Sequence, residues 1–293
     1  MPKALAGRRA RPTWIHVVGY RLLLLLLTIG GAAVLSTVLV RMAPGYGMDE
    51  RQLDPRLSER SVAAIRYAVA PNPLNSLSGL VRGDWGASIS LGRPVRELVA
   101  ERAGTTARTL AAGLALAWAL SALLCLTELL LRRNVVDLAV SLAAGGLLCL
   151  PAAVVALLAM YLEAGPTLAL AAVLLPRVVR YARGILKHGA GRPHVLAARS
   201  RGVPAGAVVM RHICLPAAPE LLALAGISVS ITAGAVIPVE ALCDSAGLGQ
   251  LVWQSAMARD LPVLLPLTTL VAAITCAANL FADASRVLVC RWA

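Results

Sequence analysis

Long apolar runs without a formal charge constrain this chain more than any other feature. A membrane-crossing helix needs roughly 20 such residues, because a helix rises about 1.5 Å per residue. Five runs are long enough, and they are Leu22–Val40, Thr109–Thr127, Leu138–Leu162, Leu221–Val239 and Leu261–Ala282. Charged residues make up 15% of the chain, whereas soluble domains have about 25%. The sequence therefore predicts an all-α, polytopic membrane protein.

A sixth apolar run, Ala164–Pro176, is shorter and ends at a group of arginines. It has 13 uncharged residues before Arg177, which is followed by Arg180 and Arg183. We interpret it as a sixth span, because an arginine near a helix end can extend its aliphatic stem toward the lipid headgroups. A re-entrant or interfacial helix is the alternative. The first run is longer than the roughly 7–15 apolar residues of a cleaved signal peptide, so we interpret it as an uncleaved span.

Basic residues cluster on one side of the predicted spans. The chain has 28 Lys and Arg against 15 Asp and Glu, which gives a formal net charge of +13. The tail 1–21 has no acidic residue, and eight basic residues with no acid lie between Glu163 and Glu220. Because basic loops stay on the cytoplasmic side of a membrane, we expect both termini in the cytoplasm. This explanation makes a nucleic-acid partner unnecessary.

The sequence shows no pattern typical of a metal site, a cofactor site or a catalytic centre. Its six cysteines form no C-x-x-C pair, its four histidines are scattered, and it has no G-x-x-x-x-G-K-[ST] phosphate loop. We therefore expect no enzyme activity and no cofactor on this chain. Glu128 and Arg132, four residues apart near the end of the second run, are interpreted as an ion pair on one helix face.

One membrane domain over residues 22–293 is expected, with two long loops. Residues 41–106 form an extracytoplasmic segment, and residues 184–219 form a cytoplasmic loop. This second loop predicts an elbow of two short helices, whose residues are described next.

The first helix of the elbow, His194–Arg201, contains no helix breaker, and Gly202 can take the positive φ that ends it. Pro204 suits the first turn of a second helix over Ala205–Cys214, which we expect to stop before Pro216. Small residues at the tip let another protein approach the backbone closely, and the arginines can pair with acids on that partner. The residues concerned, besides Gly202 and Pro204, are His194, Ala197, Ala198, Arg199, Arg201, Arg211 and His212.

The elbow residues resemble a known family. Val195–Gly202, followed by His212 and Pro219, is similar to the "EAA" loop of ABC importer permeases, the binding-protein-dependent inner-membrane subunits. The form AARSRG is similar to the dipeptide, oligopeptide and nickel branch. Other segments resemble that branch in order and at about the right spacing. They are Gly83–Ser88 with Arg93–Val95, Arg102 with Thr106, Pro238–Ala256 with Glu240 and Gly247–Gly249, Arg259–Val263, and Asn279–Leu280 with Asp283.

The resemblance implies a type I ABC importer permease fold with six transmembrane helices in the bacterial cytoplasmic membrane. It implies a pathway shared with a second homologous permease, two ATPase subunits that hold ATP and Mg²⁺ and dock on the elbow, and an extracytoplasmic substrate-binding protein. The residues expected on the side of the binding protein are Asp84, Glu240, Gly247, Gly249 and Asp260. Candidates for the pathway are Ser228, Ser230 and Thr232, for which plain helix packing is the alternative.

The implied cargo is a di- or oligopeptide, with nickel or another small solute as the alternative. Three features depart from the family pattern: Leu196 in the loop, Arg108 where an acid is usual, and the residues after Asp283. These departures bear on the substrate and the set of partners. A secondary transporter is a different class, which ionisable residues near the membrane midplane would favour. A non-transporting membrane assembly protein is a further alternative.

Overall fold

Helices account for nearly all of the structure. The computed structural model describes residues 14–42, 82–83, 85–131 and 134–289. Among these residues the only extended pairing is one isolated bridge between Ala87 and Pro94. The long helices are α1 (Trp14–Met42), α4 (Val95–Leu131), α5 (Asn134–Leu148), α7 (Gly165–Ala190), α10 (Leu215–Leu242) and α12 (Leu261–Val289). The short helices are α6 (Ala152–Tyr161), α8 (Pro193–Ser200), α9 (Ala205–Ala207), the π-helix η2 (Val208–Cys214) and α11 (Leu248–Met257).

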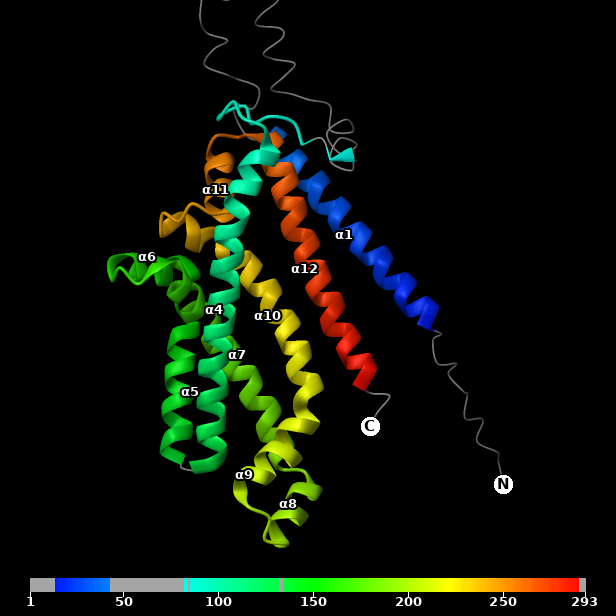
Figure 1. Cartoon of the computed structure of the whole chain (residues 1–293), viewed down its shortest axis with the longest axis vertical. Helices are drawn as coiled ribbons and strands as arrows, with labels where there is room; N and C mark the ends of the chain where they lie inside the picture. Colours follow the sequence, from blue (N-terminus) through cyan, green and yellow to red (C-terminus); the bar gives the residue numbers. More distant parts are fainter. Residues whose placement is uncertain (1–13, 43–81, 84, 132–133, 290–293) are drawn as a thin grey trace, which may run out of the picture.

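The long helices form an elongated bundle whose two ends carry different structures (Figure 1). α4 packs against α7, α10 packs against both α7 and α12, and α1 contacts α12. α11 lies at one end, beside the start of α4, and the elbow of α8 and α9 lies at the other (Figure 1). We call these the α11 end and the elbow end, and the charge pattern predicts that the elbow end is cytoplasmic.

Three helices in the described part of the chain are long and apolar enough to cross a membrane, and the bent pair of α5 and α6 would make a fourth. The three are Val95–Leu131, Ala205–Leu242 and Leu261–Ala284. They contain the predicted runs Thr109–Thr127, Leu221–Val239 and Leu261–Ala282, and α1, with 29 residues, contains Leu22–Val40. The all-α, multi-span prediction is thereby confirmed, whereas the count of six spans stays a prediction.

The third predicted run, Leu138–Leu162, is not one straight helix. α5 ends at Leu148, α6 begins at Ala152, and the two helices are bent by 97°. Pro151 stands at the N-cap of α6 with extended backbone. Proline ends a helix here because it lacks an N–H and disfavours helical backbone in the residue before it. The prediction of one continuous helix over this run is wrong, because the apolar character of the residues does not reveal the break between the two helices.

The arginines that follow the run Ala164–Pro176 do not mark a helix end. α7 continues through them to Ala190 and has 26 residues, so that Arg177 stands at its middle. Leu and Arg are both good helix formers, and the helix ends only where Gly191 and Pro193 follow. The interpretation of Arg177 and Arg180 as residues flanking a helix end is therefore wrong, since a helix can continue past charged residues when its other face is buried.

The buried core extends from the bundle into the elbow. α7 contributes Leu174 and Val178, each 1% exposed, and the elbow contributes Val195 and Val208, at 0% and 2%. All four belong to one cluster of packed apolar side chains. Burying each such side chain stabilises a fold by about 1.5–3 kcal/mol where water is the alternative. The elbow is thus anchored to the bundle rather than loosely attached.

Candidate functional sites at the two ends of the bundle

The turn of the elbow forms as the sequence predicts. α8 covers Pro193–Ser200, and Gly202 follows it with a φ of 77°, in the left-handed region where a side chain would be strained. Pro204 stands at the N-cap of α9, one position before the helical turn expected for it. The helix–turn–helix arrangement of this loop is confirmed.

The second helix of the elbow does not stop before Pro216. α9 passes into η2, which joins α10 at Leu215 without a break. Because Pro216 has no N–H, the carbonyl of His212 loses the partner that an α-helix would give it. His194 Nε2 donates a hydrogen bond to this carbonyl at 3.1 Å. His194 therefore joins α8 to η2. Sequence reasoning missed this role, although Pro216 indicates that the carbonyl of His212 lacks its usual helical partner.

The elbow exposes apolar and basic side chains together. Leu196, Met210 and Leu215, the first residue of α10, are 57%, 60% and 70% exposed. Arg201 and Arg211 are exposed as well. The apolar part of this surface was not predicted, because a single sequence does not show which side of a short helix faces the core.

The small residues of the elbow divide between its two faces. Val195 and Ala198, three positions apart on α8, both face the core, and Ala198 is 5% exposed. Ala197 is half-buried, whereas Gly202 and Gly206 are exposed. The glycines therefore form the tip, and Ala198 packs inward instead.

A mostly apolar groove of about 320 Å³ separates the elbow from the end of α4. Its lining residues are Leu129, Leu130, Arg199, Val203, Ala205, Val208 and Val209. Arg199 is half-buried there, so it is less accessible to a partner than the other two predicted arginines. The elbow packs mainly on α7 and α10, and this groove lies between it and the end of α4.

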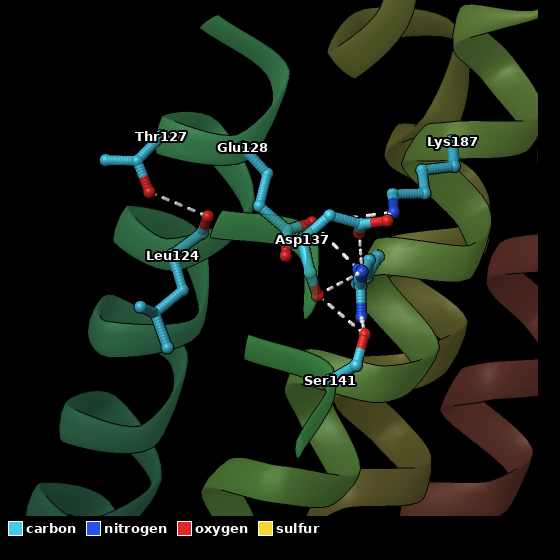
Figure 2. Close-up of polar contacts among 7 residues, drawn as sticks. Leu124, Thr127, Glu128, Asp137, Ser141 and Lys187 are labelled. Atoms are coloured by element: carbon cyan, nitrogen blue, oxygen red, sulfur yellow. Dashed lines mark hydrogen bonds and ion pairs between the residues drawn. The ribbon is translucent and has the colours of Figure 1, made fainter. Parts of the chain in front are cut away.

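A network of ion pairs joins three helices near the elbow end. Glu128 of α4, whose side chain is 6% exposed, pairs with Arg183 of α7 at 2.8 Å and lies 3.9 Å from Lys187. Asp137 of α5 pairs with the same two cations. Figure 2 shows Glu128, Asp137 and Lys187 facing one another. Arg132, the partner predicted for Glu128, lies outside the described residues.

Glu240 is fully buried at the α11 end and joins three helices. Thr106 of α4 donates its hydroxyl hydrogen to Glu240 Oε2 at 3.0 Å, and the N–H of Gly249 in α11 donates to the same oxygen at 2.7 Å. The N–H of Leu248 donates to the Thr106 hydroxyl at 2.7 Å. Any side chain at Gly247 would collide with the Glu240 carboxylate. We call these residues the Glu240 cradle, and it brings together two of the sequence motifs, Arg102 with Thr106 and Pro238–Ala256.

Asp260 fixes the segment before α4 to the start of α12. It is 1% exposed, and its Oδ2 accepts hydrogen bonds from the hydroxyls of Ser88 at 2.5 Å and Ser90 at 2.8 Å. Trp85 packs nearby against the cluster that Leu251 belongs to. Four of the five residues predicted on this side therefore lie at the α11 end, and the fifth, Asp84, lies outside the described residues.

The three small polar residues proposed for the pathway differ in exposure. Ser228 and Thr232 are 1% and 2% exposed, and their hydroxyls donate to carbonyls of their own helix, α10. Ser230 is half-buried and donates to Asn279 of α12 at 3.2 Å. Helix packing accounts for all three contacts, so a place in the pathway stays a prediction.

Several helices long and apolar enough to cross a membrane, with an elbow at one end and a buried carboxylate cradle at the other, make this a helical multi-span membrane protein. The profile of the family "Binding-protein-dependent transport system inner membrane component" matches residues 119–292, more than half of the chain. The chain belongs to this family, and it is an inner-membrane permease subunit of an ABC importer. This membership implies ATPase and binding-protein partners.

Relatives named for peptide transport align over most of the chain. A Brucella suis protein provisionally named a peptide permease is 26% identical over 90% of this chain and 94% of its own length. The oligopeptide transport system permease protein AppB of Bacillus subtilis is 23% identical over 86% of this chain and 91% of its own. OppB of Escherichia coli, named likewise, is 30% identical over 37% of this chain and 36% of its own. These relatives place the chain in the peptide branch.

Proposed function

We propose that this chain forms half of the translocation pathway of a di- or oligopeptide importer. A second homologous permease supplies the other half, two ATPase subunits bind ATP and Mg²⁺ below the elbow, and a binding protein delivers cargo at the α11 end. The peptide assignment is supported by the names of the aligned relatives. Nickel or another small solute is the alternative cargo of the same architecture.

The elbow carries the proposal for coupling. Its exposed Leu196, Met210 and Leu215 offer an apolar contact surface, and Arg201 and Arg211 offer charge to an acidic partner. Its buried side is continuous with the core of α7 and α10. A force applied by an ATPase at the elbow would therefore be transmitted to the spans as a rigid-body movement, as in other two-state packing transitions.

Replacing Met210 tests this coupling. Met210→Glu places a charge on the exposed apolar surface without touching the core, whereas the matched Met210→Leu keeps the surface apolar. We expect Met210→Glu to reduce co-purification of the ATPase subunits and peptide uptake by about tenfold, the effect of roughly 1.4 kcal/mol at an interface. Met210→Leu should retain both. Equal co-purification and uptake in the two variants would contradict docking at the elbow.

The cargo is tested by uptake in cells that lack other peptide importers. Radiolabelled di- and tripeptides should enter cells that carry the chain with its partner subunits, and an excess of unlabelled peptide should compete, while Ni²⁺ chelates and sugars should not. Competition by Ni²⁺ chelates alone would favour the alternative cargo. Uptake that persists without the ATPase subunits would favour a secondary transporter, and no uptake of any solute would favour an assembly protein.

A further inference from the structure

The half of α7 nearer the elbow presents one polar face. Its exposed residues are spaced as on a single side of a helix, at intervals of three and four. They are Arg180, Tyr181, Gly184, Lys187 and His188, with the half-buried Arg177 at the start. The opposite face, with Val178, Val179, Ala182 and Leu186, is buried against the bundle. We call the six residues the α7 polar face, and it contains no exposed aliphatic side chain.

Contacts with α4 place this face relative to the apolar layer. Gly113 of α4 lies against Leu170 of α7, and Glu128 pairs with Arg183, so the two helices run parallel. Glu128 directly follows the uncharged run Thr109–Thr127, and Arg183 therefore marks the boundary of the apolar layer. Arg180 and Arg177 stand three and six residues deeper, about 4.5 and 9 Å inside this boundary.

Among the described residues, the charges on this face and at neighbouring Arg183 are only partly compensated. Arg183 and Lys187 pair with Glu128 and Asp137. The two cations deeper in the layer, Arg177 and Arg180, form no ion pair with any acid among the described residues. Arg177 Nη1 instead donates to the carbonyl of Val173 in its own helix at 3.0 Å.

Lipid contact does not suit such a face. A helix side in contact with acyl chains carries aliphatic residues, and arginine there is costly unless it reaches water, a counter-ion or protein. Arg177 bonds toward the start of α7, away from the elbow end, so it does not extend to the nearer headgroups. Two uncompensated guanidinium groups on an exposed polar face therefore indicate a surface wetted by water and suited to an anion.

We propose that the α7 polar face lines a water-filled half of the pathway, open at the elbow end, and that Arg180 with Arg177 binds a carboxylate of the peptide cargo there. This inference rests on the proposed function, because the second permease encloses the face. A guanidinium binds a carboxylate through two parallel N–H donors, and the low dielectric of the surroundings strengthens the contact. The deeper position of the two arginines makes this end of the pathway selective for an anionic group.

Thiol labelling tests whether water reaches the face. Arg180→Cys and Gly184→Cys are introduced into the complex, and inside-out membrane vesicles are treated with a membrane-impermeant thiol reagent. Leu168→Cys is the matched control, since Leu168 is 50% exposed on the same helix but lies in its other half. We expect both polar-face cysteines to react at least about tenfold faster than the control and faster than the native cysteines. Labelling no faster than in Leu168→Cys would overturn the proposal and indicate cover by lipid or protein.

Peptide selectivity tests the carboxylate site. Uptake of a peptide with a free C-terminus is compared with uptake of its C-terminal amide, so that the unchanged binding protein contributes equally to every variant. We expect Arg180→Gln to reduce the preference for the free carboxylate by about tenfold, because a hydrogen bond to a charged group contributes about 1.5–3 kcal/mol. Arg180→Lys should retain part of the preference.

Arg192→Gln, which removes an exposed arginine outside the polar face, should leave the peptide preference unchanged. An unchanged preference in Arg180→Gln would overturn the carboxylate site even if peptides are taken up. A wild-type complex that takes up no peptide would instead overturn the proposed function, so the two failures are distinguishable.

Discussion

Replacing Gly249 by alanine tests how α11 packs on α10. The added Cβ would lie 2.8 Å from the Cα of Ile237 and 2.8 Å from the carbonyl oxygen of Val236. These are backbone atoms that cannot rotate away, so α11 must move. Overpacking of this kind costs about 1–3 kcal/mol. The movement would also break the 2.7 Å hydrogen bond that the N–H of Gly249 donates to buried Glu240, and an unsatisfied buried donor costs about 1–3 kcal/mol.

We therefore expect Gly249→Ala to lower the free energy of unfolding by about 3 kcal/mol, which corresponds to a melting temperature lower by about 6–12 °C for a chain of this size. Thermal unfolding of the purified chain in detergent, followed by tryptophan fluorescence, measures the change. Gly234→Ala is the matched control, because Gly234 is also helical but an added Cβ there meets no atom within 4 Å. Equal melting temperatures for the two variants would refute the close contact of α11 and α10.

Three further predictions concern single contacts. Arg183→Ala leaves the buried Glu128 carboxylate without its main partner and should lower the free energy of unfolding by about 3–5 kcal/mol. Lys187→Ala, at a half-exposed position, should lower it by at most about 1 kcal/mol. Similar melting temperatures for the two variants would contradict this order. His194→Ala should speed hydrogen exchange in the elbow by about tenfold, since the hydrogen bond that joins α8 to η2 is lost; unchanged exchange would refute that link. Burial raises the pKa of the Cys243 thiol, so Cys243 should react with iodoacetamide more slowly at pH 8 in the native chain than in the denatured chain. The difference between the two rates should shrink as pH rises. Equal rates at pH 8 would contradict this prediction.

The elements of this protein were predictable where local chemistry decides them. The run Thr109–Thr127 lies inside a continuous helix, and Gly202 takes the positive φ that ends α8. The bend at Pro151 was missed although its signal was present, because the apolar run around it hides the break. The length of α7 was missed because Arg177 suggested the end of a helix, whereas the buried packing of the opposite face stabilises the helix past this residue.

The contacts between distant residues could not be predicted in the same way. The pairing of Glu128 with Arg183, 55 positions away, and of Thr106 with Glu240 depends on which helices are neighbours and on their relative height. The buried side of α8 could likewise not be predicted from the sequence, since a short helix has too few residues to define an apolar face.

The sequence by itself determined a helical membrane protein and the position of the elbow, and its charges predict an orientation. These follow from the free energy of apolar burial and from the backbone preferences of glycine and proline, which act over a few residues. Only the tertiary structure decided that Glu240 is held by α4 and α11, and that Arg180 stands inside the apolar layer on an exposed face. Such features arise from the juxtaposition of helices, because the groups that surround or pair with a buried charge can be remote in the chain.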